Sequence, residues 1–259
     1  MELRNNTILI TGGTSGIGLE LATRLLDFGN TVLITGRDQS RLDQTKRQHP
    51  LIHTFQSDVS DPLAISLLFK QVTSQFPELN ILINNAGIMR RLNLHDAHID
   101  LEDINREIEI NLSGPIRMIQ QFLPHLKTKQ TAAIVNVTSG LALIPFPLSP
   151  VYSAAKSGLR AYTRTLRVQL KHTPIKVFEL LAPATKTPLN DAFKGDVKDN
   201  QLMDLDKMVD AAIRGLQKDK LEIFPGLAGV LRIMSRIAPG FMFKMMSKTV
   251  EPMLAGIKE

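Results

Sequence analysis

The chain has 259 residues, of which 43% are hydrophobic and 22% charged, a composition that is ordinary for a globular protein with a sizeable core. It contains no cysteine, which excludes disulfides, thiolate metal ligands and cysteine nucleophiles, and we expect no metal site. The net charge of +6 comes from scattered residues, and there is no tryptophan for base stacking. We therefore expect a phosphate-bearing small molecule, and no nucleic acid, as the anionic partner.

The amino end has a short apolar run at residues 8–10, followed by Thr11 and two glycines, and this run is too short for the core of a signal peptide. No window approaches the ~18 uninterrupted apolar residues that a membrane-spanning helix needs. Together with the lack of cysteine, these features predict a cytoplasmic protein.

Seven short runs rich in Ile, Val and Leu predict strands that are buried on both faces. Segments with helical periodicity separate them, and the first of these, residues 17–29, ends at a glycine. This repeated alternation predicts βαβ units and a doubly wound α/β domain, with a parallel sheet of about seven strands and helices on both faces. The domain is expected over residues 1–225, with an extension at 226–259. The predicted strands are 7–11, 31–35, 52–56, 80–84, 132–137, 175–181 and 221–224.

A glycine-rich turn, TGGTSGIG, follows the first predicted strand at residues 11–18. Gly12, Gly16 and Gly18 allow a tight turn, and they let backbone N–H groups approach a pyrophosphate at a helix N-terminus. The spacing G-x-x-x-G-x-G differs from the G-x-G-x-x-G of other dinucleotide folds. A tight connection without any ligand would also need glycines, but the position after the first strand of a βαβ unit favours dinucleotide binding.

The second predicted strand ends in TGRDQSR, where a site for NAD would usually place an acidic residue against the ribose 2′-hydroxyl. Here Arg37 stands at that end, and a guanidinium can hold a 2′-phosphate and stack on adenine. Asp38 and Ser40 are interpreted as a cap for the helix that follows. These residues favour NADP(H) as the cofactor.

Tyr152 and Lys156 lie four residues apart in VYSAAKSG, so a helix would place the phenol and the ammonium on one face. Such a pair also occurs by chance on solvated helices, and the pair alone does not separate the two interpretations.

These motifs occur together in the order TGGTSGIG, NNAG (84–87), Asn111, Ser139 and Tyr152-x-x-x-Lys156, with Ser139 thirteen residues before the tyrosine. Over about residues 5–225 the sequence resembles the short-chain dehydrogenase/reductase family. The resemblance implies a Rossmann-like fold and NADP(H)-dependent hydride transfer to or from a small-molecule carbonyl or secondary alcohol. It also implies a homodimer or homotetramer that pairs through the helices carrying Asn111 and Tyr152. The alternative is a regulator or scaffold that binds a nucleotide without turnover.

The resemblance also implies catalytic roles. Tyr152 would be the general acid in reduction and the general base in oxidation, and Lys156 would lower the pKa of its phenol and bind the nicotinamide ribose. Ser139 would hold the substrate oxygen. Asn111 would hold a water in the proton path behind Lys156.

Cofactor contacts are carried over in the same way. Asp58 would accept a hydrogen bond from the adenine amino group, with Val59 beside the ring. The segment LAPATKTPL departs from the family pattern, because Ala182-Pro183 replaces Pro-Gly and a proline offers no N–H donor, whereas Thr187 is kept. The expected contacts are Gly12, Thr14, Ser15, Gly16, Ile17, Gly18, Arg37, Asp58, Val59, Asn85, Ala86, Gly87, Tyr152, Lys156, Pro183 and Thr187.

The carboxyl-terminal part is the least regular. Residues 188–206 occupy the place of the family's variable substrate loop. The following stretch, 227–248, is mostly apolar, carries only basic charges and is divided by Pro239-Gly240. It could form a lid over the substrate, a subunit interface or a contact with an anionic membrane surface. Its MSRIAPGF segment is similar to the family branch named for the oxidoreductase of the D-alanyl lipoteichoic acid operon, which implies a bacterial or fungal enzyme.

Overall fold

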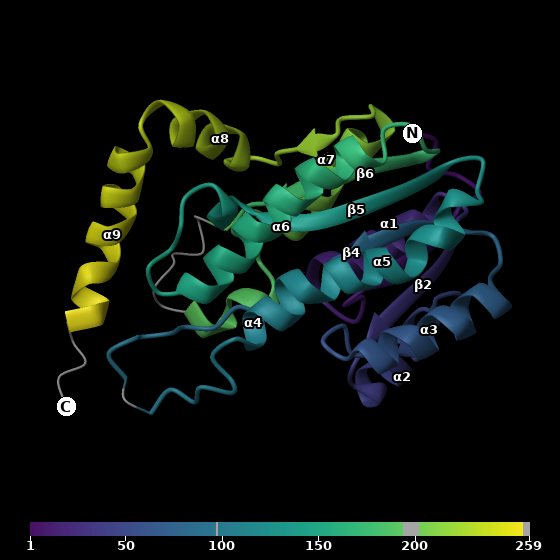
Figure 1. Cartoon of the computed structure of the whole chain (residues 1–259), viewed down its shortest axis with the longest axis horizontal. Coiled ribbons are helices and arrows are strands. Elements are labelled where there is room, and N and C mark those ends of the chain that lie inside the picture. The colour runs from purple at the N-terminus through teal and green to yellow at the C-terminus, as the bar shows by residue number, and fades with distance from the viewer. Residues whose placement is uncertain (97, 194–201, 256–259) are drawn as a thin grey trace.

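The computed structural model of the protein describes residues 1–96, 98–193 and 202–255. Seven strands form one parallel sheet in the order β3-β2-β1-β4-β5-β6-β7 (Figure 1). The chain leaves one side of β1 after β3 and continues on the other side with β4, so the topology switches between β1 and β4. The strands are β1 Thr7–Thr11, β2 Thr31–Gly36, β3 His53–Gln56, β4 Leu79–Asn84, β5 Ala132–Ser139, β6 Ile175–Ala182 and β7 Glu222–Ile223.

The single-domain, doubly wound α/β fold predicted from the sequence is thereby confirmed, and each predicted strand agrees with an observed one to within two residues. The helices are α1 Gly16–Asp27, α2 Gln39–Gln48, α3 Pro62–Gln75, α4 Arg106–Ile108, α5 Gly114–Lys127, α6 Pro150–Gln169, α7 Leu205–Gln217, α8 Ala228–Ile237 and α9 Pro239–Ala255. A π-helical turn, η1, covers Glu109–Ser113, and the 3₁₀ turns η2 and η3 cover Gly140–Ala142 and Pro188–Phe193.

Local chemistry fixes where several helices begin and end. The Asp38 carboxylate accepts hydrogen bonds from the backbone N–H groups of Ser40 and Arg41, so the predicted cap of α2 is confirmed. Asp61 caps α3 in the same manner, and a proline stands at the first position of that helix. After α1, Gly29 has a φ of 78°, a left-handed conformation that favours glycine at a helix end.

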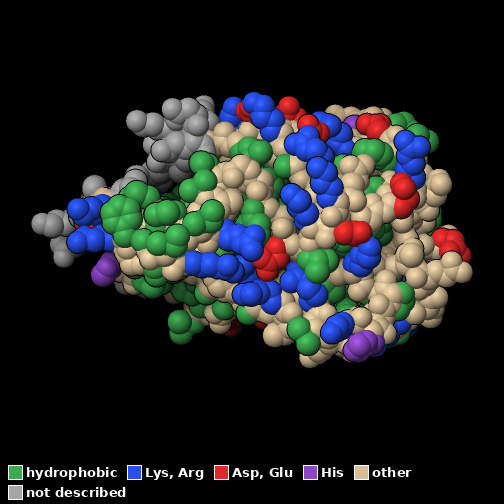
Figure 2. Space-filling model, turned by 90° about the horizontal axis from the view of Figure 1, so that it is seen from above, with side chains coloured by type: hydrophobic (Ala, Val, Ile, Leu, Met, Phe, Trp, Pro, Cys, Tyr) green, Lys and Arg blue, Asp and Glu red, His purple; other side chains and the backbone are tan. Residues whose placement is uncertain are grey.

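The extension after β7 forms an arm of two helices, α8 and α9, at one end of the molecule (Figure 1). Leu231 of α8 packs on the η2 turn, where a Cβ added to Gly140 would lie 3.1 Å from the leucine Cδ1. In α9, Val250 is buried against Leu148 and Phe193. The outer face of the arm remains exposed, and hydrophobic side chains gather there in the space-filling view (Figure 2). Of the expected substrate loop, residues 194–201 lie outside the described residues.

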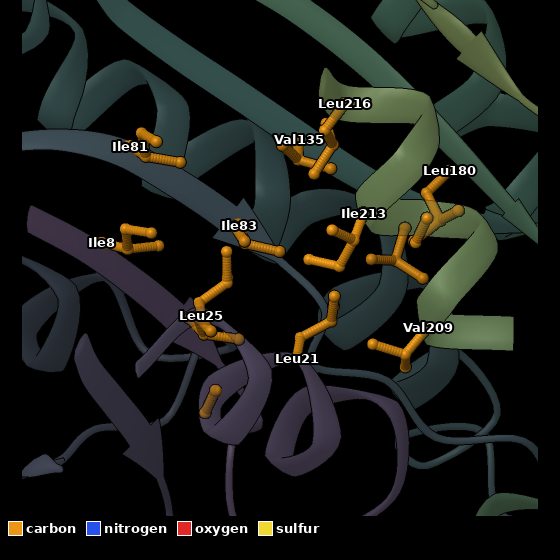
Figure 3. Close-up of a cluster of buried hydrophobic side chains, with 14 of the residues drawn as sticks. Ile8, Leu21, Leu25, Ile81, Ile83, Val135, Leu180, Val209, Ile213 and Leu216 are labelled. Atoms are coloured by element: carbon orange, nitrogen blue, oxygen red, sulfur yellow. The ribbon is translucent and has the colours of Figure 1, made fainter. Parts of the chain in front are cut away.

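Two apolar layers fill the space between the sheet and its helices. One lies under α1, α2 and α7, where Leu21, Leu25 and Ile213 meet the inward side chains of β1, β4 and β5 (Figure 3). The other lies under α3, α5 and α6, around Phe122 and Leu166. Successive side chains of a strand point to opposite faces of the sheet, so each inner strand contributes to both layers. The sequences of these strands are therefore continuously hydrophobic.

Candidate active site

A cleft opens at the carboxyl edge of the sheet, over the switch point between β1 and β4. Fourteen of the predicted site residues line it: Gly12, Thr14, Ser15, Gly16, Ile17, Arg37, Asp58, Val59, Asn85, Ala86, Gly87, Tyr152, Lys156 and Thr187. This edge is where doubly wound sheets bind their ligands, because the strand order diverges there and leaves a crevice between the connecting loops.

Several lining residues were missed by the sequence reasoning. Arg41 could have been found, since it stands one helical turn after Arg37 in a segment predicted to be helical. Ser57 carried no signal beyond its position next to Asp58. Asp38 was interpreted from the sequence only as a helix cap, yet it lines the cleft as well. The remaining missed residues are small or apolar side chains whose place depends on the fold: Thr35, Gly36, Ile88, Ile110, Val137, Thr138, Ala182, Pro188 and Leu189.

The glycine turn is locked to the end of β4. The Asn85 amide donates to the backbone oxygens of Thr11 and Gly12, both at 3.0 Å, and the Thr11 hydroxyl accepts from the N–H groups of Asn85 and Ala86. Gly12 and Gly16 have φ values of 65° and 53°, which non-glycine residues rarely adopt. The two strands on either side of the switch point therefore share one rigid cradle.

Gly18, predicted as a cofactor contact, does not line the cleft. A Cβ at this position would lie 2.3 Å from the Gly12 oxygen and 2.4 Å from the Asn85 Nδ2. Its role is to let α1 pack tightly behind the turn, which supports the cleft from outside. Pro183 is likewise absent from the lining, which instead contains Ala182 and Thr187 on either side of it.

The end of β2 brings two arginines to the cleft. Arg37 and Arg41 both line it, together with Asp38. The Nε of Arg41 lies 3.6 Å from the Asp38 Oδ2, while the other oxygen of that carboxylate caps α2. Hydrogen bonds from the Ser40 side chain and the Arg41 backbone lower the pKa of Asp38, so the carboxylate stays ionised as a cap. The two guanidiniums form a cationic end of the cleft.

The β3–α3 turn supplies the wall next to these arginines. Ser60 donates to the Asp58 Oδ1 from its backbone N–H and its hydroxyl, at 2.8 and 2.7 Å. The helix cap is provided by Asp61, so Asp58 is not needed for that purpose. The Ser57 hydroxyl is buried in the cleft wall without a hydrogen-bond partner among the described residues. A buried hydroxyl of this kind is expected to meet a polar ligand atom.

At the other end of the cleft, Tyr152 and Lys156 are both buried, each 4% exposed. The Lys156 Nζ donates to the backbone oxygen of Val137 at 2.9 Å and lies 5.8 Å from the centroid of the tyrosine ring. Ser139 ends β5 near Tyr152 and, although predicted as a catalytic residue, does not line the cleft; its hydroxyl accepts from the backbone N–H of Leu141 at 3.2 Å. The predicted pair therefore stands on one face of α6, next to the serine.

The expected lowering of the tyrosine pKa is wrong for this structure. Burial raises the pKa of Tyr152 to about 12, although the nearby Ser139 hydroxyl acts in the opposite direction. Burial also lowers the pKa of Lys156 to about 8. Removal from water disfavours the charged form of each group, and this effect outweighs the attraction between them because the ammonium is directed at the Val137 carbonyl.

A buried ion pair fixes the helix that carries these two residues. The Arg160 Nη1 donates to the Glu179 Oε2 at 2.7 Å, and the Thr138 hydroxyl donates to the other oxygen of the same carboxylate at 2.8 Å. The network ties α6 to β6 and to the end of β5, one residue before Ser139. The relative position of serine, tyrosine and lysine thus depends on a charged pair below them.

Asn111 is fully buried in the π-helical turn η1 and does not line the cleft. Its Oδ1 accepts from the N–H of Ile88 at 3.0 Å, and its Nδ2 donates to the Ile88 oxygen at 2.8 Å. A Cβ added to Gly87 would lie 2.8 Å from that Oδ1 and 3.6 Å from the Lys156 Nζ. The Asn111 side chain thus holds the loop after β4 beside Lys156. Its location in a π-helical turn is typical of functional sites.

Glu107, one turn before Asn111, was not singled out from the sequence. It is fully buried and its Oε1 accepts from the backbone N–H of Arg90 at 2.7 Å. Burial raises the pKa of Glu107, and its charge adds to the rise in the pKa of Tyr152. Nothing in the local pattern distinguishes it from the exposed acids around it, because its burial depends on the packing of α4 against α6.

A cleft at the switch point of a doubly wound sheet, with a glycine turn at a helix N-terminus, defines a dinucleotide-binding protein. Residues 6–198 match the short chain dehydrogenase family, and the chain belongs to that family of oxidoreductases acting on CH–OH and C=O groups. It is 45% identical to the "Uncharacterized oxidoreductase DltE" of Bacillus subtilis over 190 residues, 73% of this chain and 75% of that protein. The resemblance to this branch is thus confirmed.

Solved structures show the same fold. A short chain dehydrogenase from Burkholderia cenocepacia in complex with NADP superposes with a TM-score of 0.82 at 23% identity, over 95% of this chain and 99% of that one. The 3-ketoacyl-(acyl-carrier-protein) reductase from Brucella melitensis complexed with NADH gives 0.76 at 27% identity, over 85% and 95%. The same fold is therefore found with either nicotinamide cofactor, NADP in the first structure and NADH in the second.

In the described part of the chain, no helix combines the length and the apolar character needed to cross a membrane. The same residues contain no group of three or more His, Cys, Asp or Glu side chains that could hold a metal ion.

Proposed function

We propose that the protein is an NADP(H)-dependent oxidoreductase of the cytoplasm that interconverts a carbonyl compound and a secondary alcohol. The observation that carries this proposal is a single cleft with Arg37 and Arg41 at one end and Tyr152 and Lys156 at the other. The first pair suits a phosphate and the second pair suits proton transfer. A dinucleotide extended along the cleft would connect them.

The residues present fit such a cofactor. The glycine turn has no Cβ that would fill the cradle at the N-terminus of α1, and the backbone there can approach a pyrophosphate. Asp58 and the unpartnered Ser57 hydroxyl lie where the adenine end would be held. When bound, the nicotinamide supplies the hydride chemistry.

Arg37 and Arg41 support the choice of NADP(H) over NAD(H). No acidic side chain stands at the end of β2 itself, and the adjacent Asp38 is used as a helix cap. Two guanidiniums can bind a 2′-phosphate with charge-assisted hydrogen bonds, whereas they offer little to a 2′-hydroxyl.

Tyr152 suits the role of general acid. With a pKa of about 12, its phenol keeps its proton at neutral pH and can deliver it to an oxygen that gains charge during reduction. Ser139 would hold the same oxygen, and the Lys156 ammonium would stabilise the phenolate left behind. The raised pKa therefore keeps the phenol in the protonated state that a general acid for reduction needs at neutral pH.

Asn111 takes a positioning role in this proposal. Both polar atoms of its side chain are used by Ile88, so a water behind Lys156 would have to be held by a backbone carbonyl of the π-turn instead. The Asn111 amide then serves to hold the loop at Gly87 in a fixed position beside Lys156.

Cofactor preference is tested by titrating NADPH and NADH. Arg37→Asp should weaken NADPH binding by roughly tenfold or more and leave NADH nearly unchanged, because only the former carries the 2′-phosphate. Arg41→Gln should have a smaller effect in the same direction. Arg47→Asp, an exposed arginine elsewhere on α2, is the matched control for charge. Equal losses for both cofactors would contradict the assignment.

Turnover is tested with a panel of ketones and aldehydes. Tyr152→Phe should retain NADPH binding and lower the rate of reduction by about 10²–10⁴-fold, the range that a general acid contributes. NADPH binding with no turnover on any compound in the wild type would favour the alternative, a regulator that binds the nucleotide. Unchanged turnover in the variant would exclude Tyr152 as the acid.

A further inference from the structure

The outer surface of the C-terminal arm exposes a row of large apolar side chains. We call this row the arm surface, and each of its members is between 54% and 74% exposed. Monomeric soluble proteins rarely leave contiguous apolar areas uncovered unless they bind something. The row consists of Leu227, Val230, Ile233, Ile237 and Phe241.

The row follows from the helical spacing of α8. Val230, Ile233 and Ile237 recur at intervals of three and four residues, which places them on one side of the helix. The opposite side is already occupied, because Ala228 is fully buried and Leu231 packs on Gly140. The exposed side chains are therefore not needed for packing α8 onto its own domain.

Basic side chains border this apolar row, as Figure 2 shows for the edge of the hydrophobic patch. Arg232, Arg236, Lys244 and Lys248 lie on the two helices, and residues 225–250 contain no Asp or Glu. A groove on α8 combines both chemistries, because Ile233 and Ile237 line it together with the two arginines and Phe224.

The basic character continues beyond the arm. Arg232 stacks on Phe224 at 4.6 Å and lies 3.8 Å from the Glu222 carboxylate. Arg160, Arg164 and Arg167 of α6 also approach that same carboxylate, at 4.0, 3.7 and 3.9 Å. Four arginines thus share Glu222, although Arg160 also pairs with Glu179. The side of the molecule next to the arm surface therefore carries excess positive charge.

We propose that the arm surface docks on a lipid bilayer with an anionic headgroup layer. Apolar side chains would enter the outer part of the acyl region, while the long basic side chains reach the headgroups, as amphipathic helices at membrane surfaces do. A second copy of the chain is a poorer occupant, since a symmetric contact would place two acid-free basic surfaces against each other.

This proposal is independent of the oxidoreductase function, because the arm lies outside residues 6–198 that match the family. It has a consequence for that function, however. Leu231 packs on the glycine that directly follows Ser139, so a docked arm would hold the substrate end of the cleft next to the lipid surface.

The test is co-sedimentation of the full chain with phosphatidylcholine vesicles that contain either no phosphatidylglycerol or roughly 30% of it, at low and at high salt. The arm variant is Arg236→Glu/Ile237→Ser. The matched control is Leu67→Ser/Lys70→Glu on α3, which also removes one exposed apolar side chain and reverses one exposed cation. Thermal unfolding and NADPH titration check that each variant is folded, and Phe241→Ser is a second arm variant.

We expect the wild type and the α3 variant to bind the anionic vesicles, with binding that weakens at high salt. The arm variant should bind about tenfold or more weakly, because one charge contact is reversed and an apolar anchor is lost. Equal binding by the two double variants, or no dependence on phosphatidylglycerol, would overturn the proposal. A wild type that ignores vesicles but forms a dimer that the arm variant loses would assign the surface to self-association instead.

Discussion

Lys156 shows how a single residue places stability and chemistry in opposition. Its ammonium is buried, donates to the Val137 carbonyl and has a pKa lowered to about 8 from 10.5. Below that pH both the folded and the unfolded chain carry the charge, so folding includes the full penalty of burying it. Catalysis, as proposed, needs this charge beside Tyr152.

Replacing the lysine should therefore stabilise the fold while it abolishes activity. Lys156→Met is expected to raise the free energy of unfolding by about 1–3 kcal/mol at pH 7, the scale of the pKa difference less the lost hydrogen bond. Between pH 8 and 10.5 the wild type gains stability as its folded state loses the proton first, so the advantage of the variant should shrink. Urea unfolding at pH 7 and pH 9.5 checks both statements, and an equal advantage at the two pH values would contradict them.

The same residue should shape the pH profile of reduction. Tyr152, with a pKa of about 12, keeps its proton across the working range, whereas Lys156 loses its own above about pH 8. We expect kcat/KM for reduction to fall as the pH rises past about 8. In Lys156→Arg the side chain stays charged at every accessible pH, so the residual activity should lack this decline. A similar decline in both proteins would assign it to another group.

At the scale of elements, the glycine turn and α1 depend on a very close approach. A Cβ on Gly18 would overlap the Gly12 oxygen and the Asn85 amide, which hold the β1 and β4 ends together. Gly18→Ala should lower the free energy of unfolding by about 1–3 kcal/mol and weaken cofactor binding as well.

Gly240→Ala provides the comparison for that substitution. This glycine lies in α9 with nothing within 4 Å of an added Cβ, so alanine there should be neutral or stabilising by up to about 1 kcal/mol. Thermal unfolding of both variants separates the steric effect from helix propensity. Equal changes in the two proteins would mean that the close approach at Gly18 does not limit packing.

At the scale of the whole molecule, the family resemblance implies a dimer or tetramer, and α6 offers a surface for it. Its outer side carries Ala154, Ala161, Thr165 and Val168, small or apolar residues that allow two helices to approach closely. We expect light scattering after gel filtration to give a dimer or tetramer, and Ala161→Arg to shift it towards the monomer. Leu67→Arg on α3 should leave the mass unchanged. A monomeric wild type would contradict this prediction.

The sequence predicted the sheet well because the five inner strands are buried on both faces and each is marked by an apolar run of the right length. The edge strands β3 and β7 are less buried, and their places were predicted from the strand–helix alternation. The sequence predicted Tyr152 and Lys156 as a pair because the spacing of four residues is a local property of a helix. The directions of the pKa shifts of Tyr152 and Lys156 could not be predicted from the sequence. They depend on burial, and α6, β5 and the loop after β4 bury these two side chains together. The burial of Glu107 and the groove on α8 were not predicted for the same reason. Tertiary packing decides which charged and apolar residues are covered.

The switch point makes one ligand site depend on both halves of the sheet. The cradle joins β1, whose partner β2 belongs to the amino-terminal half, to β4, which begins the other half. A dinucleotide held there would touch both halves and lose its site if either one opened. Its binding should therefore raise the melting temperature of the whole domain in one cooperative transition and slow proteolysis on both sides of the sheet alike.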